Sequence, residues 1–282
     1  MEVNVRPSQI AGLWYEGEAK ALARTVDGYM DVSALPDLRG EVVALVAPHA
    51  GHRYSGPVAG YAFAAVRGRQ PEVVAVLSPF HNYHSAPLLS TTYDAYGTPL
   101  GTIPVDRAAL NGLDAALHGR FGLGLTLIAN DPEHSLEIEL PFLQRALRPG
   151  WKLLPVMVRA QEPEMCRLLG REVAALLQGR DVLLVASTDL SHYYDQQAAL
   201  ALDRATLEQV EAFDPDSLFD LERSGRGYAC GLGALASVMW AARELGADRV
   251  ELLRHATSGD VTGDYSAVVG YGAAAIVKSA RP

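Results

Sequence analysis

Five of the 8 histidines in the chain stand shortly after apolar, strand-like runs: His49 and His52 after residues 42–47, His81 and His84 after 73–77, and His192 after 182–186. A single histidine in such a place usually has a structural role, because imidazole readily donates to backbone carbonyls. Repetition at three strand ends instead predicts a functional cluster. Imidazole nitrogens bind metal ions or move protons near neutral pH, so the predicted chemistry is a metal site with acid–base groups around it.

Within each pair, one histidine is the better ligand candidate. Gly51 lies between His49 and His52, and a glycine-containing loop offers no regular geometry that would bring both rings onto one ion. We therefore favour His49. His81 is favoured over His84 because it directly follows the strand-like run, which leaves His52 and His84 as candidates for the surrounding pocket.

The two cysteines have different surroundings. Cys230 comes just before an apolar, helix-like segment at 232–245. A thiol near a helix N-terminus has its thiolate form favoured, which suits a nucleophile or a metal ligand. It could equally be a small hydrophobic residue at a tight helix start, and the residues alone leave both interpretations open. Cys166 lies within a helical apolar pattern, where packing is the expected role.

Two further segments hold titratable residues. His134 and Glu137 are spaced one helical turn apart, so they would share one face. They could bind metal, but a capped helix start with solvated charges is the ordinary account, and we expect supporting or pocket positions for both.

The segment 187–192 contains Ser187, Asp189, Ser191 and His192, which are the residue types of a hydrolytic triad. A working triad draws its members from separate elements, and no Gly-x-Ser-x-Gly motif is present. We expect His192 to transfer protons and Asp189 to orient a neighbour.

The elements that must position these residues alternate along the chain. Buried strands are predicted at 42–47, 73–77, 153–158, 182–186 and 268–277, and helices at 58–66, 106–117, 164–177, 200–212 and 232–245. This alternation predicts one domain over residues 1–282, an α/β fold built as a three-layer α/β/α sandwich with a largely buried central sheet. A hairpin predicted between 88–92 and 98–103 would make the sheet mixed. Ligands in such folds bind beyond the carboxyl ends of the strands, where the histidines cluster.

Composition excludes several classes of protein. The chain has 282 residues, 49% of them hydrophobic and 20% charged, as expected of a folded globular protein. A net charge of -9 argues against nucleic-acid or anionic-membrane partners. Residues 1–10 lack the pattern of a signal peptide, and two cysteines cannot form a disulfide framework, so we expect a cytoplasmic protein.

Several stretches together resemble the Memo family. They are Arg6 to Trp14 with Tyr15-Glu16-Gly17, Ala47 to Gly51 with Tyr54-Ser55-Gly56, Glu133 to Glu137 with Leu140-Pro141, Ser187 to His192, Ala229-Cys230-Gly231, and Ala256 to Asp264. The resemblance covers essentially the whole chain. It implies a fold like that of class III extradiol dioxygenases, and for prokaryotic members it implies a radical-SAM protein and an AMMECR-like protein as partners.

The resemblance also implies site residues. The metal ligands of the family, two histidines and a cysteine, fall on His49, His81 and Cys230, and His192 falls where the dioxygenases keep a catalytic histidine. Tyr54 lies in a matching motif and is expected at the pocket. The chain departs from common family patterns at His52, where an aromatic residue is frequent, and at Phe80, where a small polar residue is usual.

These observations predict one metal ion per chain, with iron(II) favoured and copper or zinc also suited to imidazole and thiolate ligands. The expected function is that of a dioxygenase-like oxidoreductase acting on an unidentified small molecule. Because Cys230 takes the place of the carboxylate in the usual facial triad, ring cleavage does not follow automatically. The alternatives are a non-catalytic metal-binding or adaptor protein that binds a partner peptide in the pocket, and a zinc-type hydrolase that uses a metal-activated water.

Overall fold

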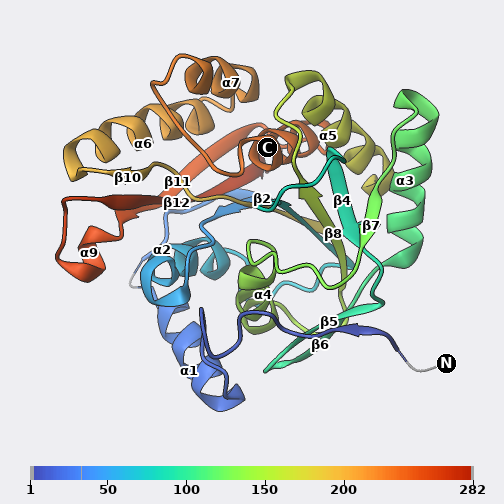
Figure 1. Cartoon of the computed structure of the whole chain (residues 1–282), viewed down its shortest axis with the longest axis horizontal. Helices are drawn as coiled ribbons and strands as arrows, with labels where there is room; N and C mark the ends of the chain where they lie inside the picture. The colour runs from blue at the N-terminus through green and yellow to red at the C-terminus, as the bar shows by residue number, and fades with distance from the viewer. Residues whose placement is uncertain (1–2, 33, 281–282) are drawn as a thin grey trace.

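The computed structural model describes residues 3–32 and 34–280, and within them a large mixed sheet forms the centre of the fold (Figure 1). Its strands are β2 (Gly40–Ala47), β3 (Val73–Pro79), β4 (Leu88–Thr91), β7 (Thr126–Ile128), β8 (Lys152–Val158), β9 (Val182–Ser187), β10 (His192–Tyr194), β11 (Arg249–Thr257) and β12 (Val268–Ser279). The order across the sheet is β10-β12-β2-β9-β3-β8-β4-β7, and β11 pairs with β12.

Helices cover both faces of this sheet. They are α1 (Ala19–Met30), α2 (His52–Ala64), α3 (Arg107–Phe121), α4 (Leu140–Ala146), α5 (Pro163–Leu177), α6 (Gln196–Glu211), α7 (Pro215–Arg223), α8 (Leu232–Glu244), the short α9 (Gly259–Thr262) and the 3-10 turn η1 (Glu137–Glu139). On one face, α2 packs on β2 and β12, with α1 and α4 against it; on the other, α8 packs on β3 and β9 and is covered by α5 (Figure 1). The predicted three-layer α/β sandwich is confirmed.

The central strands β2, β9, β3 and β8 run parallel. Every residue of β3 and β9 is buried, which explains why their sequences are continuous apolar runs without alternation. Their carboxyl ends meet at one edge of the sheet, so the residues that follow them are brought together. The strand predicted at 268–277 is also present, and it pairs antiparallel with β2.

The predicted hairpin between 88–92 and 98–103 is wrong. The true hairpin joins β5 (Ala95–Thr98) to β6 (Gly101–Pro104), and it forms a separate small sheet with β1 (Val5–Arg6). Its tight turn places Gly101 at a φ of +125°, where a residue with a side chain would be strained. Strand β4 instead joins the main sheet between β8 and β7, because its four residues are all buried and need cover on both faces.

Among the described residues, no helix combines the length and apolar character needed to cross a bilayer.

Candidate metal centre

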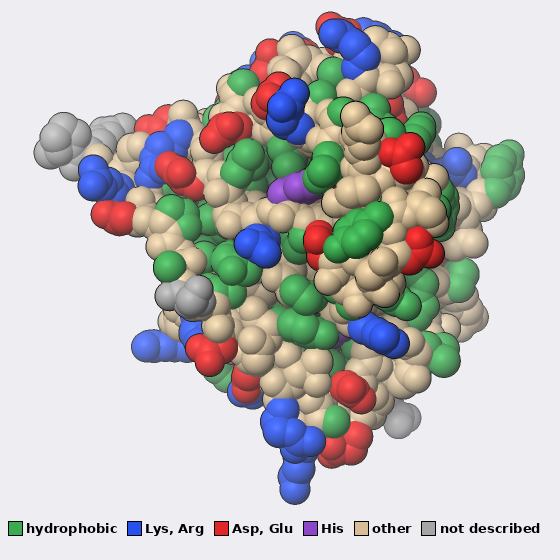
Figure 2. All heavy atoms as spheres, turned by 90° about the vertical axis from the view of Figure 1, so that its left-hand side faces the viewer, with side chains coloured by type: hydrophobic (Ala, Val, Ile, Leu, Met, Phe, Trp, Pro, Cys, Tyr) green, Lys and Arg blue, Asp and Glu red, His purple; other side chains and the backbone are tan. Residues whose placement is uncertain are grey.

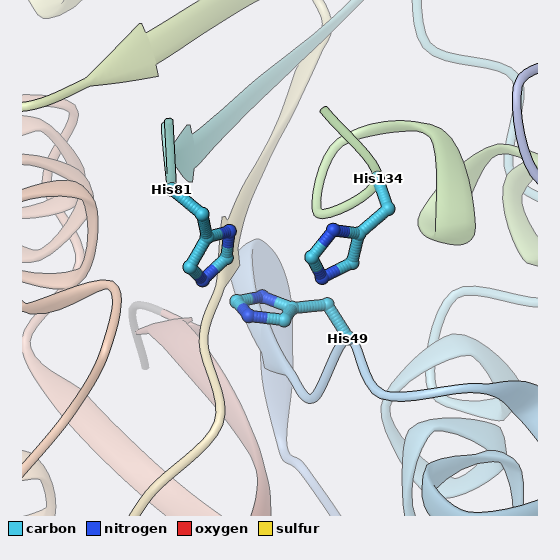
Figure 3. A group of neighbouring side chains, drawn as sticks. All are labelled: His49, His81 and His134. Carbon is cyan, nitrogen blue, oxygen red and sulfur yellow. The ribbon is translucent and has the colours of Figure 1, made fainter. Parts of the chain in front are cut away.

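Three histidines from different elements face one point (Figure 3). His49 follows β2, His81 follows β3, and His134 lies in the loop that precedes η1. One ring nitrogen of each lies within 4.8 Å of the others. The rings of His81 and His134 are stacked with centroids 4.8 Å apart, and the His49 ring stands edge-on to both. The parallel order of β2 and β3 thus delivers two imidazoles, and the loop delivers the third.

Cys230 lies beside this cluster. Its Sγ is 3.2 Å from His49 Nε2, and the backbone N–H of Asp189 donates to the same sulfur at 3.2 Å. The position is fixed by the tight start of α8, since a Cβ on Gly231 would come within 2.5 Å of the Ser187 carbonyl oxygen. Among the described residues, the group whose ligand atoms all lie within 4.8 Å of one another is thus His49, His81 and His134, and Cys230 contacts it through His49.

Hydrogen bonds to the Nδ1 atoms orient two of the rings. His49 Nδ1 lies 2.9 Å from Ser187 Oγ, and His81 Nδ1 donates to Glu133 Oε1 at 2.9 Å. A partner on Nδ1 sets the tautomer of a metal-binding histidine and leaves Nε2 as the free electron-pair donor. This arrangement is the usual support for a metal-binding imidazole.

The charge states of the donors depend on burial. Burial, reinforced by the neighbouring rings, holds the pKa of His49 well below its usual value, and burial lowers that of His134 to about 4. For His81 the effect of burial is outweighed by the Glu133 carboxylate, so its pKa is raised. Burial and the nearby Asp189 raise the pKa of the Cys230 thiol. His49 and His134 are therefore neutral at pH 7, and Cys230 carries its proton.

The loop carrying His134 is held by a buried arginine near the N-terminus. Arg6 forms ion pairs with Asp131 at 2.9 Å and Glu137 at 2.6 Å, and it also donates to the Glu133 carbonyl oxygen at 2.9 Å. A helical turn does begin at Glu137, as η1, but the prediction of solvated charges is wrong, because Glu133 and Glu137 are buried. Glu137 faces the N-terminal segment, where Ser8 and the backbone of Gln9 also donate to it.

The two residues predicted to be catalytic lie at the end of β9. The Asp189 carboxylate accepts from the backbone N–H of His49 at 2.7 Å, and burial raises its pKa to about 7. His192 Nδ1 donates to the Leu190 carbonyl oxygen at 2.8 Å, and burial lowers the pKa of this ring. Asp189 thus holds the backbone that positions His49. The hydrogen bond of His192 to a carbonyl oxygen places the proton of its ring on Nδ1.

The remaining pocket candidates separate in space. His52 begins α2 with its ring buried, donates from Nε2 to the Ile138 carbonyl oxygen at 3.0 Å, and packs against Phe142, away from the cluster. His84 accepts at Nδ1 from the backbone N–H of Ala86 in the loop after β3. Tyr54 is half-exposed and lines a cavity beside the histidines.

Comparison with known proteins identifies the family of this chain. A family model described as Memo-like protein matches residues 6–275. The chain belongs to the Memo family. A MEMO1 family protein of Nitrosopumilus maritimus is 34% identical over 95% of this chain and 98% of its own length, and one of Methanothermobacter thermautotrophicus is also 34% identical over 95% of this chain and 98% of its own length.

Solved structures add a likeness of fold alone. A crystal structure of an uncharacterised protein from Escherichia coli K12 aligns with a TM-score of 0.50 at 14% identity, covering 82% of this chain and 99% of that chain.

The cavity beside the histidines of this Memo chain has a volume of about 550 Å³. Its lining combines aromatic and apolar side chains with one arginine and two aliphatic hydroxyl groups, namely Leu13, Trp14, Arg53, Tyr54, Tyr193, Ser258, Thr262, Val269 and Tyr271. Trp14 joins it to the cluster, since its ring centroid lies 4.1 Å from that of His134.

A larger groove of about 850 Å³ runs along α6 and β11. Figure 2 shows this side of the molecule, where hydrophobic side chains gather around a partly covered histidine. The groove contains His255, paired with the buried Asp203, but it holds none of the clustered ligands. The lining of the smaller cavity does not include these ligands either, but its Trp14 contacts the His134 ring and its Ala50 directly follows His49.

Sequence reasoning missed Glu133 and Glu139, and it placed His134 outside the ligand set. Both glutamates lie in the segment 131–141, whose many charged residues favour a solvated helix start. The sequence signal that could have found them is the alternation of charged and apolar residues in this segment. Its apolar residues are buried in the structure, so the charged residues between them are drawn inward as well.

Proposed function

We propose that this chain holds one metal ion between His49, His81 and Cys230, with His134 facing the same point, and that it oxidises a small molecule with dioxygen. The observation that carries the proposal is the convergence of three imidazoles within 4.8 Å, with a thiol 3.2 Å from one of them. The cavity lined by Trp14 would hold the substrate, since the Trp14 ring contacts that of His134.

The donor set fits a transition metal. Imidazole and thiolate bind zinc at about 2.0–2.1 Å and about 2.3 Å, so two such ligands on one tetrahedral ion stand roughly 3.3–3.7 Å apart. The Cys230 to His49 distance of 3.2 Å is close to that range. The spread of up to 4.8 Å among the imidazole nitrogens is wider, so loading would draw the rings inward by on the order of 1 Å.

Iron(II) is the favoured metal, through the resemblance of the Memo family to extradiol dioxygenases. Copper and zinc also bind imidazole and thiolate ligands. Bound iron(II) would supply one-electron chemistry with dioxygen, which no side chain of this chain can provide.

The chain itself would supply the proton transfers. His192 donates from Nδ1 to Leu190, so its Nε2 carries the free electron pair, and its lowered pKa keeps the ring neutral at pH 7. It can therefore take a proton from a substrate hydroxyl, a role worth roughly 10²–10⁴-fold in rate. Asp189 keeps His49 in place through the backbone.

The test is to load the protein anaerobically with iron(II) and measure oxygen uptake against a panel of catechols and other small phenols. Uptake that requires both His49 and His192 would support the proposal. Metal-dependent hydrolysis without oxygen consumption would replace it with a zinc-type hydrolase. Tight metal binding with neither activity would leave a non-catalytic metal-binding protein.

A further inference from the structure

Ser187 makes three short contacts through one hydroxyl group. Its Oγ lies 2.6 Å from the Ser135 carbonyl oxygen, 2.8 Å from Glu139 Oε1 and 2.9 Å from His49 Nδ1. Ser187 ends β9, directly beside Ala47 at the end of β2, and Glu139 ends η1. Both Ser187 and Glu139 are fully buried.

The protons available to these groups allow one arrangement in which every contact is a hydrogen bond. A hydroxyl has one proton to donate and two lone pairs that accept. The Ser135 carbonyl oxygen can only accept, so Ser187 must donate its proton there. The two remaining contacts then require donors: His49 must carry its proton on Nδ1, and Glu139 must carry a carboxyl proton.

Each other distribution of protons loses a contact. If Glu139 were ionised and accepted from Ser187, the hydroxyl oxygen would face the Ser135 oxygen at 2.6 Å with no proton between them. If Ser187 donated to His49 instead, the same repulsion would remain and the His49 proton would move to Nε2, toward Cys230. Two buried polar atoms that touch without a hydrogen bond destabilise the fold by roughly the free energy of the missing bond. Folded proteins rarely retain such contacts.

We propose that Glu139 is a neutral carboxylic acid that acts with Ser187 as a positioning pair, holding His49 in the Nδ1–H tautomer so that its Nε2 electron pair faces the site. This proposal rests on the proposed function, because it assumes that Nε2 of His49 meets the metal. It assigns a role to a buried acid that neither the ligand set nor the proton transfers use.

The surroundings of Glu139 agree with a neutral acid. Burial, with the nearby Asp189, holds the pKa of this carboxyl well above its usual value. Its second oxygen, Oε2, has no hydrogen-bond partner among the described residues. An ionised carboxylate would leave a charged oxygen buried without a donor, which costs far more than burying a neutral one.

The same arrangement explains the contact between Cys230 and His49. With the proton of His49 on Nδ1, its Nε2 is an acceptor, and the Cys230 thiol donates to it across 3.2 Å. The metal-free site then carries no charge on either residue. An arriving ion would displace only the thiol proton, with the imidazole already in the tautomer that binds.

Infrared spectroscopy of the metal-free protein tests the charge of Glu139. With ¹³C-labelled glutamate at pH 7, the wild-type chain should show the C=O band of a protonated carboxyl, and Glu139→Gln should lack it. Ser187→Ala should shift this band, because the acid loses its acceptor, and that shift assigns the band if the Gln variant does not fold. A wild-type spectrum without such a band overturns the proposal.

Nitrogen NMR on ¹⁵N-histidine protein tests the tautomer, with His49 assigned by a His49→Gln variant. The expected signature is a protonated Nδ1 and an unprotonated Nε2 in the wild type. Ser187→Ala should abolish this single tautomer, whereas Ser237→Ala, which removes a buried hydroxyl bonded to the Cys166 and Gly233 carbonyl oxygens, should not. A protonated Nε2 in the wild type, or an unchanged signature in Ser187→Ala, overturns the proposal.

Zinc binding separates this inference from the proposed function. Ser187→Ala should lose about 10–100-fold in zinc affinity, as other partners of metal-bound histidines do, and Glu139→Gln, whose amide can still donate, should stay within about threefold of wild type. A wild-type chain that binds no metal would refute the proposed function while the infrared and NMR results still decide the state of Glu139 and His49.

Discussion

The carboxylate of Glu133 accepts two hydrogen bonds from His81, one from the backbone N–H at 2.6 Å and one from ring Nδ1 at 2.9 Å. It also accepts from the backbone N–H of His134 at 3.0 Å. One buried acid therefore sets both the position and the tautomer of His81 and fixes the loop that presents His134. The His81 side chain is 36% exposed, and this partner holds both its backbone and its ring.

Replacing Glu133 with Gln should weaken metal binding by about 10–100-fold, because the ring loses a charged partner that keeps Nε2 directed at the ion. Titration of the metal-free protein with zinc and a competing chelator measures this. Glu164→Gln, a change of the same chemistry at an exposed position, should bind like wild type. Equal affinities in the two variants would show that Glu133 does not support a ligand.

Replacing Cys230 with Ala should lower zinc or iron affinity by at least about 10–100-fold, the range seen for groups that merely support a ligand. The thiol is only 3.2 Å from His49 Nε2, so its loss removes a donor from the site. Cys166→Ala is the control, because that sulfur is fully buried against Ala160. Metal analysis and circular dichroism on both variants separate lost binding from lost folding, and wild-type affinity in Cys230→Ala would remove the cysteine from the ligand set.

Replacing Arg6 with Met should lower the free energy of unfolding by about 3–5 kcal/mol, because two buried carboxylates, Asp131 and Glu137, lose their cation. Urea unfolding followed by circular dichroism measures the change. Arg145→Met breaks a partly exposed pair with Asp27 and should cost at most about 1 kcal/mol. Similar losses in both variants would mean that the Arg6 ion pairs are no stronger than a surface pair.

The parallel strands and the histidines that follow them could be predicted from the sequence, since apolar runs without alternation indicate strands buried on both faces. The pattern also located Cys230 before a helix, although it could not decide whether the sulfur reaches His49. Each of these predictions depends only on which residues directly follow a strand or precede a helix, and the structure agrees with them.

The segment around His134 could not be predicted in the same way. Its charges suit a solvated helix start, and the group that overrides this preference is Arg6, which lies 125 residues from Asp131 in the sequence. Contacts of this range are set by tertiary packing and leave no local pattern. The same limit hid the partners of Glu139 and Asp189, whose roles depend on strands β2 and β9 lying side by side.

His52 predicts how stability changes with pH. Burial lowers the pKa of its ring to about 4, against 6.5 for a free histidine, so between these values the unfolded chain binds more protons. This contribution to stability is complete above about pH 6.5 and is lost as the pH falls toward 4, by about 3 kcal/mol. His52→Gln, whose amide can still donate to Ile138, removes the titrating group. From pH 7 to pH 4, the variant should therefore gain about 3 kcal/mol relative to wild type in urea unfolding. A constant difference across this range would mean that the folded protein accepts a proton on His52 without cost.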